Sequence, residues 1–204
     1  MRIPAAILLI SLISGCTSQT EDVPEAVVSA PAPTAATEIQ PTSVPAPVTE
    51  EQPASAPLGW VPDQACNFIG KDFGVEIRPY QNEYEDEYSC STPYKNLQEA
   101  VNLPNNLAYY VTGNRDLATE VKLVLNINEP SKQAYAKGQL KKFSAVVAKA
   151  ATGAGLPSEI SNAITSGTPK IHDGAGYRQE LKRDNWPTGK GYELHYIVTK
   201  VGEG

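Results

Sequence analysis

The chain has 204 residues, a formal net charge of −6 and a hydrophobic content of 41%, which is enough material for one folded domain. Its acidity is concentrated near the N-terminus: residues 17–57 hold six acidic residues and no Lys or Arg, whereas residues 58–204 carry 16 basic and 17 acidic side chains. A nearly neutral domain without a basic run argues against a nucleic-acid-binding face or a face for anionic lipid headgroups.

The N-terminal segment has the pattern of a secretion signal. Arg2 precedes eleven mostly apolar residues, 3–13, and the small residues Ser14 and Gly15 then lead to Cys16. An apolar stretch of this length is too short for a membrane-spanning helix, which needs about 20 residues. The sequence therefore predicts a secretory signal peptide that is removed from the mature protein.

The end of this segment, Ile13-Ser14-Gly15-Cys16, resembles the lipobox of bacterial lipoproteins, in which an aliphatic and two small residues precede a lipid-bearing cysteine. The resemblance implies a signal peptide of residues 1–15 and a diacylglycerol on the Cys16 sulfur, usually with a third acyl chain on its nitrogen. Two or more acyl chains anchor a protein stably to a membrane. Thr17, in place of Asp, implies sorting to the outer membrane, with the domain facing the periplasm. An ordinary secretory signal that contains a cysteine by chance is the alternative.

Residues 16–57 are predicted to form the lipid-bearing end and a disordered linker. Positions 17–57 include eight prolines, and no aromatic residue occurs before Trp60. Such a segment cannot bury enough apolar surface to offset the entropy lost on ordering its backbone. Flexible and proline-rich chains of this length span roughly 40–70 Å. The 147 residues that follow, 58–204, are expected to form a single globular domain.

Two cysteines, Cys66 and Cys90, are left once Cys16 is assigned to the lipid. An even number of cysteines in an oxidising compartment predicts a Cys66–Cys90 disulfide. A redox pair or a metal-binding pair is the alternative. The separation of 24 positions and the lack of a Cys-x-x-Cys motif favour the structural bond.

Three extended segments are expected at the start of the domain. Tyr and acidic residues alternate along residues 73–90, which predicts a strand with one face in water. Residues 106–113 and 118–128 are joined by a short connection that begins with Gly113-Asn114, which predicts a hairpin. The apolar side of its second strand consists of Val121, Leu123, Leu125 and Ile127. Val124 is the one apolar residue on its other side.

Two helices are expected next. Pro130 suits a first helical turn, and the spacing of apolar residues predicts a helix through residue 151. Its expected inner face consists of Tyr135, Gln139, Phe143, Val146, Val147 and Ala150. A shorter helix begins near Ser158 and ends at Gly167, a natural C-cap.

Two alternating strands are expected to close the chain, on either side of the turn-rich loop 184–191. Their inner faces consist of Ala175, Tyr177, Gln179 and Leu181 in the first strand and Tyr192, Leu194, Tyr196 and Val198 in the second. The order of strands, helix, helix and hairpin predicts an α+β domain, in which two helices pack on one face of an antiparallel sheet.

Chemistry-bearing motifs are sparse. His195 lies in a predicted strand, whereas His172 adjoins Asp173, a carboxylate that could orient its imidazole. Two distant histidines and a paired cysteine set supply too few ligands for a metal site, and the acidic run 83–87 lacks the pattern of a calcium loop. No nucleotide-binding or hydrolase motif is present. We therefore expect no catalytic residue, no metal site and no cofactor.

The aromatic residues are the remaining candidates for function. Tyr and Trp suit recognition because one end of the side chain is apolar and the other forms hydrogen bonds. Filling an aliphatic-poor core is the alternative use of most of the ten Tyr and two Trp. Trp186 lies in a Pro/Gly-rich loop, a place where aromatic residues are often exposed and functional. We single out Trp186, Tyr84 and Tyr88 as the expected binding surface.

Three functions are consistent with these features. The first is a non-enzymatic module, anchored to the membrane by its lipid, that binds a periplasmic protein or a glycan such as peptidoglycan. The second is an inhibitor or immunity-type lipoprotein that blocks a hydrolase reaching the periplasm. The third is an enzyme acting on cell-wall material, which would require His172 and a carboxylate to converge in one cleft.

Overall fold

The structure is a computed structural model of the chain, and it describes residues 58–99 and 102–201. The predicted signal peptide 1–15, the lipidation site Cys16 and the predicted linker 16–57 lie outside the described residues. The domain is therefore described from Leu58 onward.

Strands, α-helices and 3-10 helices are interspersed along the described part of the chain. In chain order the described elements are α1 (Pro62–Cys66), the 3-10 helix η1 (Lys71–Phe73), β1 (Gln81–Tyr84), β2 (Glu87–Ser91), β3 (Lys95–Asn96), β4 (Asn106–Gly113), β5 (Ala118–Ile127), the 3-10 helix η2 (Pro130–Lys132), α2 (Gln133–Thr152), α3 (Ser158–Ser166), β6 (Lys170–Gly174), β7 (Tyr177–Asn185) and β8 (Tyr192–Lys200).

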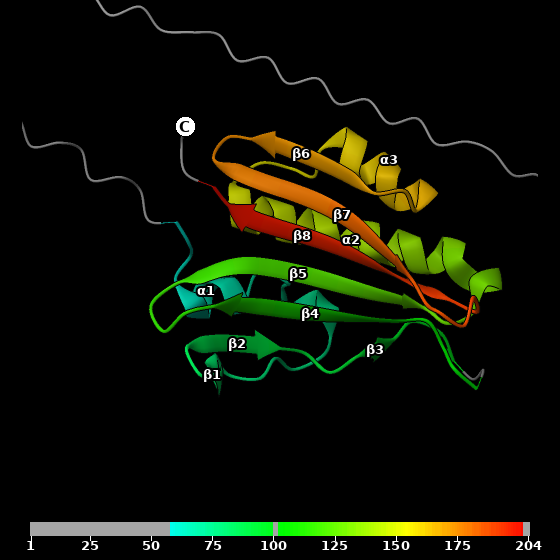
Figure 1. The fold of residues 1–204 in the computed structure, drawn as a ribbon, viewed down its shortest axis with the longest axis horizontal. Helices are drawn as coiled ribbons and strands as arrows, with labels where there is room; N and C mark the ends of the chain where they lie inside the picture. Colours follow the sequence, from blue (N-terminus) through cyan, green and yellow to red (C-terminus); the bar gives the residue numbers. More distant parts are fainter. Residues whose placement is uncertain (1–57, 100–101, 202–204) are drawn as a thin grey trace, which may run out of the picture. The chain divides into compact units, whose positions relative to one another are not determined.

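The described strands form one antiparallel sheet. Its order is β1-β2-β4-β5-β8-β7-β6, with β3 paired to β4. Figure 1 shows α2 and α3 behind this sheet, so that one face is covered by helices and the other is turned toward the viewer. The domain therefore belongs to the α+β class with an antiparallel sheet.

The central hairpin β4–β5 forms where the alternation predicted it. Each strand presents every second residue to the helices, and Val121, Leu123, Leu125 and Ile127 are completely buried there. The pairing of Leu107 with Leu125 sets the register that places these apolar side chains on the helix-covered face, and a slip by one residue would turn all of them to water.

Helix α2 buries a different stripe from the predicted one. Phe143 and Val147 are buried as expected, but Tyr135 is 55% exposed and Val146 is 39% exposed. The inner stripe consists instead of Ala136, Leu140, Phe143, Ser144, Val147, Ala148 and Ala151. These residues are mostly small, which lets the helix approach the sheet closely. The prediction of the α2 face was therefore wrong by about one residue in rotation.

The predicted single strand over residues 73–90 is instead a hairpin. β1 and β2 reverse at Glu85-Asp86, and Glu85 has a positive φ of 46°. An alternating pattern is the same for one strand as for two strands joined by a two-residue turn, so the pattern did not reveal the reversal.

The C-terminal part contains one strand more than the predicted hairpin. β6 precedes β7 and forms an edge of the sheet. Ala175, which we expected within a strand, lies in the turn between β6 and β7, where its φ is 50°. α1 was also not predicted, so the expected order of elements was incomplete at both ends of the domain.

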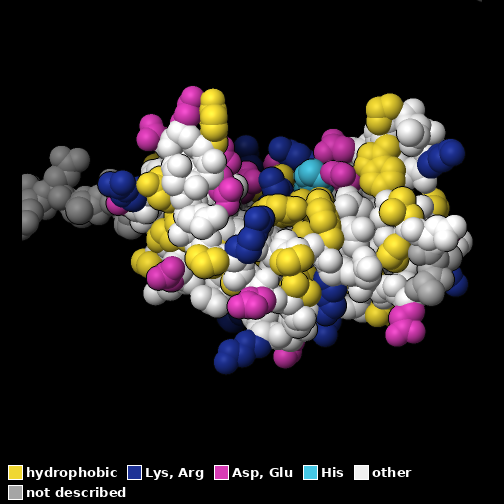
Figure 2. Space-filling view, turned by 90° about the horizontal axis from the view of Figure 1, so that it is seen from below, with side chains coloured by type: hydrophobic (Ala, Val, Ile, Leu, Met, Phe, Trp, Pro, Cys, Tyr) yellow, Lys and Arg dark blue, Asp and Glu magenta, His cyan; other side chains and the backbone are white. Residues whose placement is uncertain are grey.

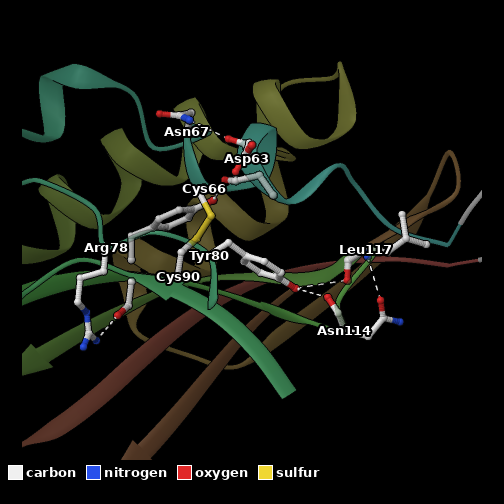
Figure 3. The surroundings of a disulfide bond; sticks show 11 residues. Asp63, Cys66, Asn67, Arg78, Tyr80, Cys90, Asn114 and Leu117 are labelled. Carbon is white, nitrogen blue, oxygen red and sulfur yellow. Dashed lines mark hydrogen bonds between the residues drawn. A yellow bond between two sulfur atoms is a disulfide. The ribbon is translucent and has the colours of Figure 1, made fainter. Parts of the chain in front are cut away.

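A disulfide joins Cys66 at the end of α1 to Cys90 in β2, with their Cα atoms 6.1 Å apart, as the cysteine count predicted. Figure 3 shows Tyr80 beside this bond, with its hydroxyl directed to the turn between β4 and β5. That hydroxyl donates to the carbonyl of Asn114 at 2.9 Å. The disulfide and Tyr80 together fasten the N-terminal part of the domain to the sheet.

Candidate functional site

The face of the sheet opposite the helices is open to solvent, and we call it the open face. Cross-strand pairing puts alternate residues of β4, β5, β8 and β7 side by side on it. Two neighbouring rows cross its centre, and they consist of Ala108, Val124, His195 and Lys182 in one and Tyr110, Lys122, Ile197 and Glu180 in the other. The open face is thus formed by the four most extensive strands and rests on a rigid scaffold.

Apolar side chains are buried at the centre of the open face although no described helix covers it. Ala108 is fully buried, Val124 is 5% exposed and Ile197 is 6% exposed. Their neighbours on this face include the long polar side chains of Tyr110, Lys122 and Lys182, whose stems can lie over apolar surface. Val124, the exception in the alternation of β5, therefore belongs to an apolar centre shared by three strands.

Tyr110 and Tyr94 form an aromatic pair beside this centre. Their rings meet edge to face with centroids 6.5 Å apart, and the Lys122 ammonium lies 5.9 Å from the Tyr110 ring centroid. Burial, and then the neighbouring Tyr94, raise the pKa of the Tyr110 hydroxyl well above its ordinary value. Tyr110 therefore remains a neutral hydrogen-bonding group, while Tyr94 is 49% exposed and reaches solvent.

Three ionisable residues converge at one end of the open face, and we call them the histidine–carboxylate cluster: Asp184, Glu193 and His195. His195 Nε2 lies 2.8 Å from Glu193 Oε2 and 3.8 Å from Asp184 Oδ2. The side chain of His195 is 19% exposed, against 31% for Glu193 and 64% for Asp184. The imidazole is thus held at the sheet surface, with both carboxylates on its Nε2 side.

The strand geometry explains this convergence. Glu193 and His195 are two positions apart in β8 and therefore point to the same face, and Asp184 of β7 pairs directly with Glu193. Figure 2, which views the molecule from the β1–β3 edge, shows a histidine with acidic side chains beside it where the upper outline is hollowed between two raised ends. From the sequence we placed His195 in a strand and expected no catalytic residue and no metal site. The Glu193-x-His195 spacing within a strand was the signal that could have indicated the cluster.

Trp186, the leading residue of the predicted binding surface, borders the histidine–carboxylate cluster. It follows Asp184 by two positions, and its amide donates to the carbonyl of Gly191 at 3.1 Å. The indole ring covers Gly191 closely enough that a Cβ there would be 2.4 Å from a ring carbon. Trp186 is consequently half-buried rather than fully exposed.

The other two predicted surface residues lie elsewhere. Tyr84, at the end of β1, is 70% exposed. Tyr88 stacks on Tyr80 with ring centroids 6.0 Å apart and pairs with Gly113 at the opposite end of β4 from Trp186. Since Tyr88 alternates with Ser89, it also points to the helix side of β2. The structure therefore does not bring Trp186, Tyr84 and Tyr88 together in one surface.

His172 contacts Glu159 rather than Asp173, the neighbouring carboxylate that the sequence suggested as its partner. Its Nδ1 lies 2.7 Å from Glu159 Oε1 of α3, whereas Asp173 accepts a hydrogen bond of 2.7 Å from Arg178. The arginine lowers the pKa of the Asp173 carboxyl. Among the described residues neither histidine forms a hydrogen bond with a hydroxyl or a thiol, so no activated nucleophile of the histidine-dependent type is assembled there.

None of the helices in residues 58–99 and 102–201 combines the length and the apolar character needed to cross a membrane.

Comparison with protein families, with curated proteins and with solved structures gave no match for this chain.

Proposed function

We propose that the chain is a lipid-anchored protein of the bacterial cell envelope whose domain binds a partner protein through the open face of its sheet. The lipobox-like end of the signal segment supports the anchor, and Thr17 supports the outer membrane as its location. The Cys66–Cys90 bond supports an oxidising compartment such as the periplasm, because disulfides rarely persist in the cytosol.

The observation that carries the binding role is the composition of the open face. It combines the buried apolar centre of Ala108, Val124 and Ile197 with the half-buried Trp186 and the exposed Tyr94 near its margins. Interfaces have this arrangement of an apolar centre with aromatic anchors and a polar rim. A sheet face needed only for solubility requires neither the aromatic margin nor the apolar centre.

The charges favour a protein partner over a glycan. Lys122 and Lys182 lie on the same face as Glu180 and Glu193, so the open face presents both signs within neighbouring rows. A mixed pattern of this kind selects a partner with complementary charges, whereas a neutral sugar chain offers none. An enzyme that the domain inhibits would be one such protein, and peptidoglycan retention is an alternative outcome of the test.

The predicted lipid anchor is tested by replacing the sulfur atom of Cys16 with oxygen. Cys16→Ser should abolish incorporation of labelled palmitate and release the protein from the membrane fraction, because a serine lacks the acylated sulfur. Thr17→Ser should retain both properties. Membrane retention of the Cys16→Ser protein without label would show that lipid is not the anchor.

The binding role is tested by comparing two aromatic residues on opposite faces. Chemical crosslinking and affinity purification from the native envelope would be performed with the wild type, with Trp186→Ala and with Tyr135→Ala. Tyr135 is 55% exposed on α2 and serves as the matched control. We expect a partner protein whose recovery falls strongly with Trp186→Ala and is unchanged with Tyr135→Ala. Equal recovery with both variants would contradict binding at the open face, and retention of peptidoglycan alone would favour a glycan ligand.

A further inference from the structure

We infer that the histidine–carboxylate cluster is a binding site for a divalent transition-metal ion, with Zn²⁺ as the reference ligand. This inference is independent of the proposed anchor and partner. It rests on the placement of Asp184, Glu193 and His195 at adjacent positions of two paired strands. One ring nitrogen and two carboxylate oxygens would supply three ligand atoms, and a fourth position would face solvent.

The distances suit an ion of this size. The three potential ligand atoms all lie within 4.8 Å of one another, and His195 Nε2 is 2.8 Å and 3.8 Å from the two carboxylate oxygens. Zn²⁺ bonds of about 2.0–2.2 Å at tetrahedral angles place ligand atoms roughly 3.3–3.6 Å apart. Small rotations of the Glu193 and Asp184 side chains are therefore enough to convert the contacts into coordination. The backbone needs no rearrangement.

The scaffold holds the ligands in place. β7 and β8 pair along nine residues from Tyr177–Lys200 to Asn185–Tyr192, and Val124 of β5 lies beside His195 in the same row. Ligands on paired strands lose little freedom when the ion binds, and preorganisation of this kind raises affinity. The imidazole is also more buried than either carboxylate, which restricts its orientation.

The local charge favours a cation. Two carboxylates lie beside one imidazole. The lysine in the same row as His195 is Lys182, and its Nζ lies 3.8 Å from Glu180 Oε2. Lys182 is therefore paired with a carboxylate outside the cluster. Asn126 pairs directly with Glu193 across β5 and β8. Its Oδ1 atom is buried and has no hydrogen-bond donor among the described residues. The ligand atoms of Glu193 and Asp184 lie within 4.8 Å of each other, so their carboxylates repel, and a bound cation relieves that repulsion.

The ligand set selects the class of metal. An imidazole nitrogen with carboxylate oxygens suits Zn²⁺, Cu²⁺ or Ni²⁺, whereas Ca²⁺ and Mg²⁺ prefer oxygen ligands alone. Zinc sites with three protein ligands leave a fourth coordination position open, and a water molecule or a further ligand can occupy it. On the open face this ligand could come from solvent or from a molecule bound there.

The experiment is a calorimetric titration of ZnCl₂ into the full chain in detergent, with Cys16→Ser in every protein so that no free thiol competes for the metal. The sequence has two histidines, and the second one gives a matched control. We expect one Zn²⁺ per chain, binding at least about tenfold weaker in His195→Gln and Glu193→Gln, since loss of even an outer-shell partner of a metal ligand weakens metal binding by about 10–100-fold. His172→Gln should bind as tightly as the reference protein, and Ca²⁺ should bind at least about tenfold more weakly than Zn²⁺.

Three results would overturn the inference: no Zn²⁺ binding by the reference protein, unchanged binding in His195→Gln, or a loss confined to His172→Gln. Thermal unfolding of each variant separates loss of a ligand from loss of the fold. If His195→Gln does not fold, ¹⁵N spectra of the two imidazoles in the reference protein decide the question. Zn²⁺ should then shift the Nε2 signal of His195 and leave that of His172 unchanged, and the converse would contradict the site.

Discussion

The indole ring of Trp186 lies against the backbone of Gly191, so closely that a Cβ on Gly191 would be 2.4 Å from the ring atom Cζ3. A hydrogen bond of 3.1 Å from the Trp186 amide to the Gly191 carbonyl closes the same loop. One side of the ring is therefore committed to the fold, and the side chain as a whole is half-buried. The β7–β8 loop positions an aromatic side chain at the edge of the open face instead of leaving it free.

Gly191→Ala should destabilise the domain by roughly 1–3 kcal/mol, the usual cost of overpacking. The added Cβ would lie 2.4 Å from the backbone carbonyl oxygen of Ile127 as well as against Trp186, so neither neighbour can move freely. Urea unfolding measures the effect. Gly138→Ala in α2 is the control, because apart from its chain neighbours and the backbone of its own helix nothing lies within 4 Å of its Cβ position. That change should stabilise the domain by about 0.4–1 kcal/mol.

The two tryptophans should respond differently to truncation. Trp60 is 8% exposed, donates from Nε1 to the carbonyl of Ala151 at 2.8 Å and stacks on Tyr177. Trp60→Ala should therefore cost about 3–5 kcal/mol. Trp186→Ala should cost less than about 1.5 kcal/mol because the ring is only half-buried. Unfolding midpoints of both variants check this, and a cost for Trp186→Ala as large as for Trp60→Ala would assign that ring to the core.

Removal of the disulfide should lower stability by about 3–4 kcal/mol, the chain-entropy value for a loop closed across 24 positions. The appropriate comparison is the wild type against the double variant Cys66→Ala, Cys90→Ala, in urea. The wild type measured with a reductant should approach the double variant. A wild type whose stability does not change with reductant would show that the bond is absent in solution.

Stability should fall at alkaline pH because of two buried tyrosines. Burial raises the pKa of Tyr109 and Tyr196 far above their ordinary value of 10.0, so the unfolded chain loses these protons first. Their contribution is complete below about pH 10 and is lost as the pH rises toward the folded-state pKa. Urea midpoints measured through this range should decline less steeply in Tyr196→Phe than in the wild type. Tyr84→Phe, at a position 70% exposed, should leave the slope unchanged.

The strongest sequence patterns were the ones that gave the right structure. In β5 every second residue from Val121 to Ile127 is aliphatic, and β8 has the same alternation with the apolar and aromatic residues Tyr192, Leu194, Tyr196 and Val198, all of which are buried. An alternation of apolar and polar residues is sufficient to predict a strand when one face of that strand is fully apolar. Gly153 and Gly167 likewise end α2 and α3 in the left-handed conformation, for which glycine is suited.

The incorrect predictions come from patterns that two structures share. The alternation around Glu85 fits a continuous strand and a tight hairpin equally well. In α2 the buried stripe contains Ala136, Ser144 and Ala148, small residues that give a weak hydrophobic signal although they pack closely. β6 has few apolar residues because it is a short edge strand, and its burial is correspondingly low.

The candidate site was only partly visible in the sequence. Trp186 was singled out from its loop composition, and the structure places it beside the histidine–carboxylate cluster. The cluster itself depends on the register between β7 and β8, which pairs Asp184 with Glu193. Residues nine positions apart and joined by a loop carry no local pattern that indicates such a pairing. Conversely, the adjacency of His172 and Asp173 suggested a contact that the structure replaces with Glu159.

Site-specific photo-crosslinking in the native envelope tests the central claim, binding through the open face, most directly. A photoreactive amino acid would replace Lys182 on the open face or Lys141 on the solvent side of α2, both of them exposed. The account predicts a discrete protein adduct from position 182 that is absent from position 141. An adduct from position 141 without one from position 182, or no protein adduct from either position, would contradict it.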